Sequence, residues 1–84
     1  MSKIEKIMEK HPDYIFMVMD GFDDAILGML YTSEDSKRLI YSVKRIIEIL
    51  CEDMPEEDAW EFFEYNIAGS FMGDQTPLLC YDLI

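Results

Sequence analysis

The residues of this chain best suited to chemistry are acidic, and they recur at helical spacing in one segment. Glu57, Asp58, Glu61 and Glu64 are followed by Tyr65, and no lysine, arginine or histidine occurs after residue 45. Like charges four residues apart destabilise a helix by about 0.2–0.5 kcal/mol per pair. A function can offset that cost, because carboxylates on a helix can pair with the Lys and Arg side chains of another protein. We therefore predict that these five residues bind a partner; the alternative is a surface that only keeps the protein soluble.

Enzyme and metal chemistry find little support in the sequence. His11 is the only histidine and precedes a proline, which leaves no set of residues for a catalytic triad or a His-rich metal site. Asp20, Asp23 and Asp24 crowd one turn, but their spacing is not that of the Asp-x-Asp-x-Asp-Gly calcium loop. No glycine loop of the phosphate-binding kind opens a helix. We expect a non-enzymatic protein with no catalytic residues, no metal and no cofactor.

Length and composition indicate one small globular domain over residues 1–84. Half of the residues are hydrophobic, which separates the chain from disordered sequences. No apolar run approaches the roughly 20 residues that span a bilayer, and the first residues lack the apolar core of a signal peptide. We therefore expect the protein in the cytoplasm of a host cell, with Cys51 and Cys80 as buried thiols rather than a disulfide.

The charge of the chain is unevenly divided. Residues 1–45 hold eight acidic and seven basic side chains, a net of −1, whereas residues 46–84 hold ten acidic and none basic, a net of −10; together these give −11. Such asymmetry repels nucleic acid and steers a protein toward basic protein surfaces. The expected partner is a basic host or defence protein, with no direct contact to nucleic acid or membrane.

The first part of the chain predicts one short helix and a β-hairpin. A helix over residues 3–10 ends before Pro12, because proline disfavours helical geometry in the residue that precedes it. Apolar runs at 14–19 and 25–31 flank an Asp-Gly-Phe-Asp-Asp segment typical of a turn, so we expect two strands there. Both runs are nearly continuous rather than alternating. This indicates that either strand is covered on both faces, or that one run belongs to a buried helix.

The next segment has two interpretations. Residues 36–52 keep apolar residues at helical spacing, which favours one long helix, whereas the β-branched and aromatic residues at 38–42 favour a strand. A helix over 55–68 is clearer, because Pro55 suits a first helical position and acidic residues follow it. Asn66 is expected to bond the backbone of the following loop. The apolar side of this helix is predicted to comprise Ala59, Phe62, Asn66, Ile67 and the two core residues Trp60 and Phe63.

Two glycines and a proline redirect the chain after this helix. Gly69 sits where a helix end calls for a left-handed residue, and Gly73 sets up a second reversal. Pro77 forces Thr76 to be extended and leads into a last strand over 78–82. We interpret these residues as scaffold that returns the chain to the sheet.

Residues 61–77, Glu-Phe-Phe-Glu-Tyr-Asn-Ile-Ala-Gly-Ser-Phe-Met-Gly-Asp-Gln-Thr-Pro, resemble the carboxy-terminal signature of small, mostly uncharacterised proteins of tailed bacteriophages and related mobile elements. In those relatives, the stretch similar to Arg-Leu-Ile-Tyr-Ser is a short strand that leads into a helix, which implies a strand at 38–42. The resemblance implies a phage or mobile-element origin, and it carries no activity and no site residues. The matching positions of the signature are Glu64, Asn66, Gly69, Gly73, Thr76 and Pro77.

These patterns predict an α+β fold, with a small antiparallel sheet of three to four strands and two to three helices packed on one face. The strands are expected at 14–19, 25–31, 38–42 and 78–82. Two classes of function stay open. The first is an acidic inhibitor or decoy of phage type, such as an anti-CRISPR or anti-restriction protein, which occupies a basic nucleic-acid-binding surface. The second is a small assembly or regulatory protein that acts through homo-oligomerisation or sheet-edge pairing, its acidity being only solubilising.

Overall fold

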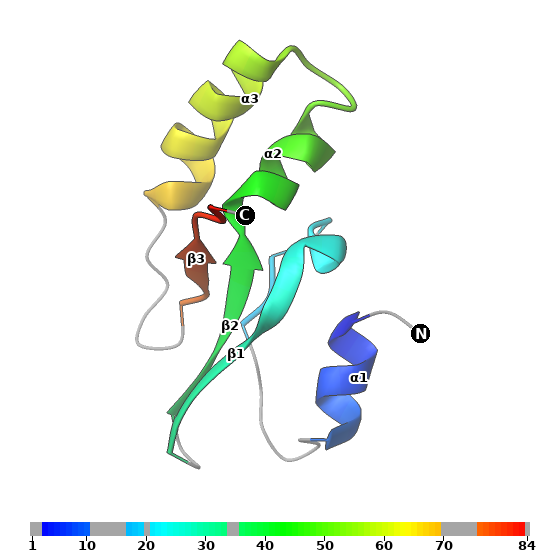
Figure 1. The fold of residues 1–84 in the computed structure, drawn as a ribbon, viewed down its shortest axis with the longest axis vertical. Coiled ribbons are helices and arrows are strands. Elements are labelled where there is room, and N and C mark those ends of the chain that lie inside the picture. Colours follow the sequence, from blue (N-terminus) through cyan, green and yellow to red (C-terminus); the bar gives the residue numbers. More distant parts are fainter. Residues whose placement is uncertain (1–2, 11–16, 20, 34–35, 70–75, 84) are drawn as a thin grey trace.

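Helices and short strands follow one another along the chain as Figure 1 shows. The computed structural model describes residues 3–10, 17–19, 21–33, 36–69 and 76–83. In chain order the elements are α1 (Lys3–Lys10), the 3-10 helix η1 (Asp23–Ala25), β1 (Ile26–Ser33), β2 (Ser36–Ser42), α2 (Val43–Leu50), α3 (Glu56–Phe63), the π-helical turn η2 (Glu64–Ala68) and β3 (Leu78–Cys80).

The strand β2 is the middle strand of a sheet with the order β1-β2-β3. β1 pairs with it antiparallel, with Met29 opposite Leu39, whereas β3 pairs with it in parallel, with Ile40 opposite Leu78. The α+β class is confirmed, but the sheet is mixed where we expected an antiparallel one. The path of the chain explains why β3 is parallel to β2. After β2 the chain continues into α2, and α3 folds back beside α2 (Figure 1). The chain then re-enters the sheet in the direction of β2. Parallel neighbours need a long crossover of this kind.

The hairpin consists of β1 and β2, whereas we predicted a hairpin of residues 14–19 and 25–31. β1 and β2 confirm the strands predicted at 25–31 and 38–42, and these two pair with each other. Residues 17–19 belong to no strand, and the rest of that predicted strand lies outside the described residues. Met19 contacts the sheet by its backbone instead, because its N–H donates a hydrogen bond to the Tyr41 hydroxyl over 2.9 Å, and it packs against the buried cluster. The apolar run at 17–19 therefore reflects packing against the sheet and not strand pairing.

The core lies between the buried side of the sheet and the helices α2 and α3. Leu39 and Tyr41 of β2 and Ile46 of α2 are the largest fully buried side chains. Phe63 of α3 is buried as predicted, whereas Trp60 is only half-buried and packs against the edge of the core. The buried cluster comprises Ala25, Ile26, Leu39, Tyr41, Val43, Ile46, Ile47, Leu50, Ala59 and Phe63.

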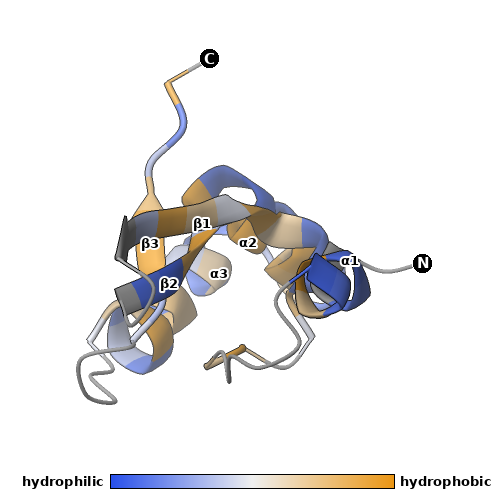
Figure 2. Ribbon diagram, turned by 90° about the horizontal axis from the view of Figure 1, so that it is seen from below, coloured by the Kyte–Doolittle hydropathy of each residue, from blue (hydrophilic) through white to orange (hydrophobic). Residues whose placement is uncertain are grey.

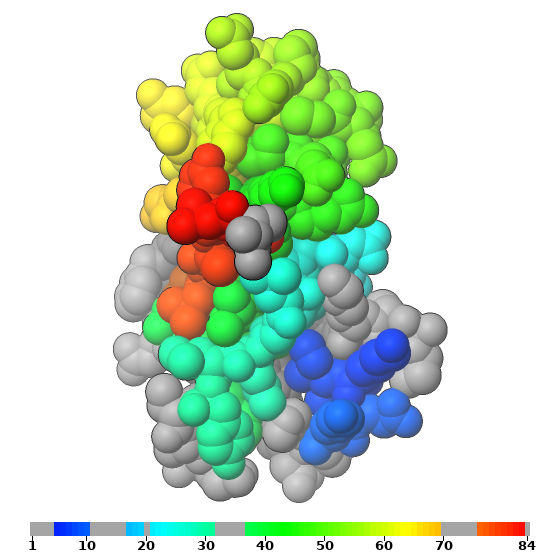
Figure 3. Space-filling model, in the orientation of Figure 1, coloured from blue at the N-terminus to red at the C-terminus, as the bar shows by residue number. Residues whose placement is uncertain are grey.

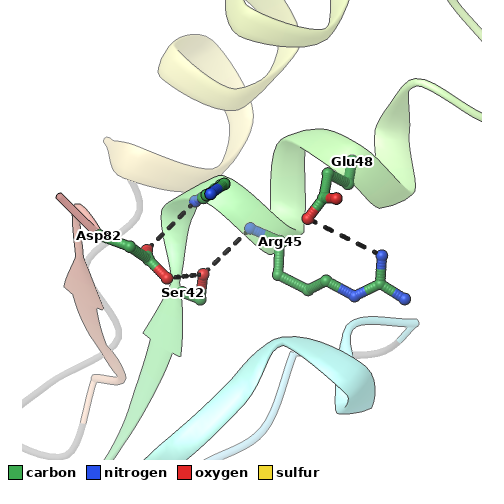
Figure 4. A network of polar contacts seen from close by, with 5 residues as sticks. Ser42, Arg45, Glu48 and Asp82 are labelled. Carbon is green, nitrogen blue, oxygen red and sulfur yellow. Dashed lines mark hydrogen bonds and ion pairs between the residues drawn. The ribbon is translucent and has the colours of Figure 1, made fainter. Parts of the chain in front are cut away.

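The junction between β2 and α2 decides between the two interpretations of residues 36–52. The chain is a strand up to Ser42 and a helix from Val43, because the Ser42 hydroxyl caps the helix by accepting the Arg45 N–H over 3.0 Å. The same hydroxyl donates to the Asp82 carboxylate over 2.6 Å (Figure 4). The Lys44 N–H also donates to this carboxylate, over 3.4 Å. Asp82 thus ties the C-terminal segment to the first turn of α2.

Two smaller predictions are wrong. Gly69 was expected to be left-handed, but its φ is −85°, because the helix ends in the π-helical turn η2 and the chain leaves it in a right-handed conformation. Gly21 has the positive φ instead, 87°, in the turn before η1. Cys51 and Cys80 were expected to be buried, yet both are exposed free thiols, since Cys51 follows the last turn of α2 and Cys80 ends β3.

Candidate partner-binding site

The helix α3 presents one side to the core and the other to solvent. It begins after Pro55, and Ala59 and Phe63, four residues apart, are its buried positions. Contact with α2 therefore covers only a narrow stripe of the helix, and the remaining positions stay accessible. All five residues predicted to bind a partner are exposed: Glu57, Asp58, Glu61, Glu64 and Tyr65. We refer to these five residues as the acidic face, which lies at the end of the molecule away from the hairpin tip (Figure 3).

The structure brings part of the acidic face together around a pocket. Asp58, Glu61 and Tyr65 line an open pocket of about 420 Å³, whereas Glu57 and Glu64 are exposed on the same helix without lining it. The other walls of the pocket, which we call the α3 pocket, are Met54, Phe62 and Asn66. Carboxylates and apolar groups thus share one concave surface.

Phe62 was assigned to the wrong side of the helix in the sequence analysis. Its ring is 41% exposed and Tyr65 beside it is 81% exposed. Asn66 is exposed as well, and its amide donates to the Phe62 carbonyl oxygen over 3.2 Å, within the same helix. Helical spacing held the signal, because Phe62 follows Asp58 by four residues and therefore lies above it on the same side. The sequence analysis placed Phe62 at the edge of the apolar side, but the buried stripe is narrower and leaves that edge exposed.

No lysine or arginine among the described residues forms an ion pair with a carboxylate of the acidic face. The ion pair nearest to it in the sequence joins Arg45 and Glu48 on α2, with an N–O distance of 3.9 Å (Figure 4). Both of those side chains are about half exposed, so the pair contributes little to stability. The acidic face therefore keeps its charge available to an outside cation.

Trp60 lies at the other flank of α3 and fixes the C-terminal segment. Its ring meets Phe63 edge-on, with centroids 5.9 Å apart, and stacks on Tyr81 at the same centroid distance with an interplanar angle of 23°. Aromatic pairs of this geometry contribute about 0.5–1.5 kcal/mol beyond burial. Together with the Asp82 contacts, this stacking fixes where the chain runs after β3.

The motif residues predicted as scaffold hold β3 in place. Thr76 and Pro77 are buried directly before β3. The Thr76 carbonyl oxygen accepts a hydrogen bond from Arg38 Nε over 2.7 Å. Gly73 lies outside the described residues.

The arrangement on α3 suits the binding of a cation carried by another protein. Exposed carboxylates attract lysine and arginine, and exposed aromatic rings add a face on which a guanidinium or ammonium group can stack. Within the described ranges, no group of three or more His, Cys, Asp and Glu side chains is arranged to hold a metal ion. The described helices include none long and apolar enough to cross a membrane.

Comparisons with known proteins do not name a relative. No protein-family model, curated protein or solved structure matches the chain.

Proposed function

We propose that this protein is a non-enzymatic inhibitor that binds the basic surface of another protein through its acidic face. The observation that carries the proposal is the combination, along α3 and the start of η2, of exposed carboxylates without an ion-pair partner among the described residues and two exposed aromatic rings, Phe62 and Tyr65. Carboxylates alone bind weakly in water, because exposed ion pairs contribute about 0–1 kcal/mol each. Aromatic anchors supply the buried contact that specific interfaces need.

The partner we propose is a nucleic-acid-binding protein of a host or of its defence systems, such as a CRISPR effector or a restriction enzyme. Such proteins present rows of Lys and Arg side chains to phosphates, and a row of carboxylates can occupy them instead. The similarity of residues 61–77 to a signature of tailed-phage proteins supports this class of partner. The proposal predicts that the protein competes with nucleic acid and does not bind it.

The test compares two variants of equal charge. The acidic-face variant carries Glu57→Gln, Glu61→Gln and Glu64→Gln, which changes the net charge from −11 to −8. The control variant carries Glu9→Gln, Glu48→Gln and Glu52→Gln, three exposed positions outside α3 and outside the acidic face, with the same net charge. Each protein is immobilised, incubated with bacterial lysate at low salt, and the captured proteins are identified by mass spectrometry.

The proposal predicts that wild type and control variant capture the same nucleic-acid-binding protein and that the acidic-face variant loses it. Added DNA should release that protein from the wild type, because both ligands occupy one basic surface. Capture that survives in the acidic-face variant, or that DNA leaves unchanged, would contradict the proposal.

A further inference from the structure

The two faces of the sheet differ sharply in burial. Opposed residues of paired strands point to the same face, so Leu39 and Tyr41 mark one face and Leu30 and Ile40 the other. The first face is in the core, with Leu39 and Tyr41 at most 1% exposed. On the second face Leu30 is 39% exposed, and Ile40 and Leu78 are half-buried. We call this second face, comprising Gly28, Leu30, Arg38, Ile40, Leu78 and Cys80, the open sheet face.

The open sheet face is apolar although the described helices leave it uncovered. A sheet with one face in water normally alternates apolar and polar residues along each strand. Here Leu30, Ile40 and Leu78 stand where that rule expects polar side chains, and Arg38 is the one charged residue of the face. Figure 3 shows the strands β1 and β3 at the surface on this side, and Figure 2 shows the C-terminal segment projecting from it. A strand pattern that is apolar on both faces indicates a second covering layer.

We propose that a second copy of this chain covers the open sheet face, so that the protein forms a two-fold symmetric dimer. The face carries one cation, Arg38, and at its other end the Asp82 carboxylate, which accepts a hydrogen bond from Ser42, the residue opposite Cys80. A second copy turned end to end can match this pair, whereas a basic partner is drawn to the many carboxylates of α3. A second copy offers matching apolar groups, since Leu30, Ile40 and Leu78 of one chain meet the same residues of the other.

Charge selects an antiparallel arrangement of the two copies. Residues 46–69 hold eight carboxylates and no basic side chain, and they form the α2–α3 end of the molecule, away from the hairpin tip (Figure 1). Turning the second copy end to end places the two acidic ends far apart. It also brings Arg38 of each copy toward the end of the other at which Asp82 caps α2. A parallel arrangement would set the two acidic ends side by side, which repulsion disfavours.

The free edge of β1 is a less suitable site for a second copy, which would have to add a strand there. α1 lies beside this edge (Figure 1), and residues of α1 line an open pocket of about 580 Å³ together with Gly28 and Met29. A strand from another copy would have to displace α1 to extend the sheet. β3, at the opposite edge, has only three residues.

The dimer should be weak and should respond to salt in a characteristic direction. Three short strands bury less than the roughly 800 Å² per partner of a standard interface, so we expect a dissociation constant on the order of 0.1 mM. Two chains of charge −11 repel each other, and screening reduces that repulsion. Dimerisation therefore strengthens as salt is added. Binding to a basic partner through the acidic face weakens instead, so the two proposals fail independently.

The first experiment measures molar mass by sedimentation equilibrium up to a chain concentration of about 1 mM, at low and high salt. The wild type should rise from 9.9 kDa toward twice that value, more steeply at high salt. Leu30→Lys places a charge on the open sheet face and should stay monomeric. The matched control Met8→Lys changes a residue of α1 that is 45% exposed and should dimerise as the wild type does. A wild type that stays at 9.9 kDa throughout, or a Leu30→Lys variant that dimerises equally, would overturn the proposal.

A second experiment needs no substitution, so it is decisive even where Leu30→Lys fails to fold. Both cysteines are exposed, but Cys80 lies on the open sheet face and Cys51 follows α2. The rate at which N-ethylmaleimide modifies Cys80 should fall several-fold as the protein is concentrated at high salt, while the rate at Cys51 stays constant. Equal concentration dependence at the two thiols, or none at either, would contradict the proposed interface.

Discussion

The substitution Phe63→Ala tests the orientation of α3, on which the accessibility of the acidic face depends. Phe63 is 6% exposed, packs in the core cluster and meets the Trp60 ring edge-on at 5.9 Å. Removing a buried phenylalanine costs about 3–5 kcal/mol. A domain of 84 residues has a free energy of unfolding of about 4–13 kcal/mol. The substitution should therefore remove between a quarter and all of the stability of the protein.

The neighbouring residue supplies the control for this measurement. Phe62→Ala makes the same chemical change one position away, at a ring that is 41% exposed, and should cost about 1 kcal/mol or less. Urea denaturation followed by circular dichroism at 222 nm gives both free energies without depending on Trp60 fluorescence. In thermal melts the Phe63 variant should lose at least about 12 °C, since each kcal/mol shifts a domain of this size by about 4–8 °C. A Phe62 variant as unstable as the Phe63 variant would refute the assigned orientation of α3.

Two further predictions concern contacts that fix the sheet and the C-terminal segment. Tyr41→Phe leaves the partly buried Met19 N–H without the hydroxyl that accepts its hydrogen bond at 2.9 Å. It should cost about 0.5–1.5 kcal/mol in urea denaturation and speed amide exchange at Met19, and unchanged exchange would argue against this bond. The hydrogen bond from the Ser42 hydroxyl, with help from backbone amides, lowers the pKa of the Asp82 carboxyl below its ordinary value of 3.8. A carboxyl with a lowered pKa stabilises the folded protein above pH 3.8, and this contribution is lost as the pH falls through the pKa of the folded state. The wild type should therefore unfold at higher urea than Asp82→Asn at neutral pH, with the difference shrinking below pH 3.8, whereas a difference independent of pH would contradict a charged Asp82 at the start of α2.

The elements set by local pattern could be predicted from the sequence. The helix at 55–68 combines a proline, an acidic first turn and apolar residues in period, and it is observed as α3 continued by η2. Residues 36–52 satisfied both a helical and a strand pattern, so periodicity left both interpretations open. The Ser42 cap marks where the strand ends and the helix begins, and the spacing of apolar residues does not reveal such a cap.

Features that depend on tertiary arrangement could not be predicted in the same way. The parallel pairing of β3 follows from the return of the chain through α2 and α3, and no local pattern encodes that route. β1 pairs with β2 and not with the run at 14–19. The two candidate partners have similar apolar composition, so the sequence pattern does not distinguish between them. Within the candidate site, the exposure of the predicted carboxylates is observed, whereas Phe62 was missed because the buried stripe of α3 is narrower than its apolar composition suggested.

The most direct test of the central claim is the salt dependence of binding between this protein and the basic protein that it captures. Isothermal titration at about 50 mM and about 200 mM salt gives the affinity of the wild type, of the acidic-face variant and of the equally charged control variant. The account predicts that the wild type and the control bind tightly at low salt and lose affinity as salt rises. The acidic-face variant should bind weakly at both concentrations while its melting temperature stays within a few degrees of wild type, because the relief of like-charge repulsion offsets the lost favourable charge at the start of α3. Equal low-salt affinity of all three proteins would show that the acidic face is not the binding surface.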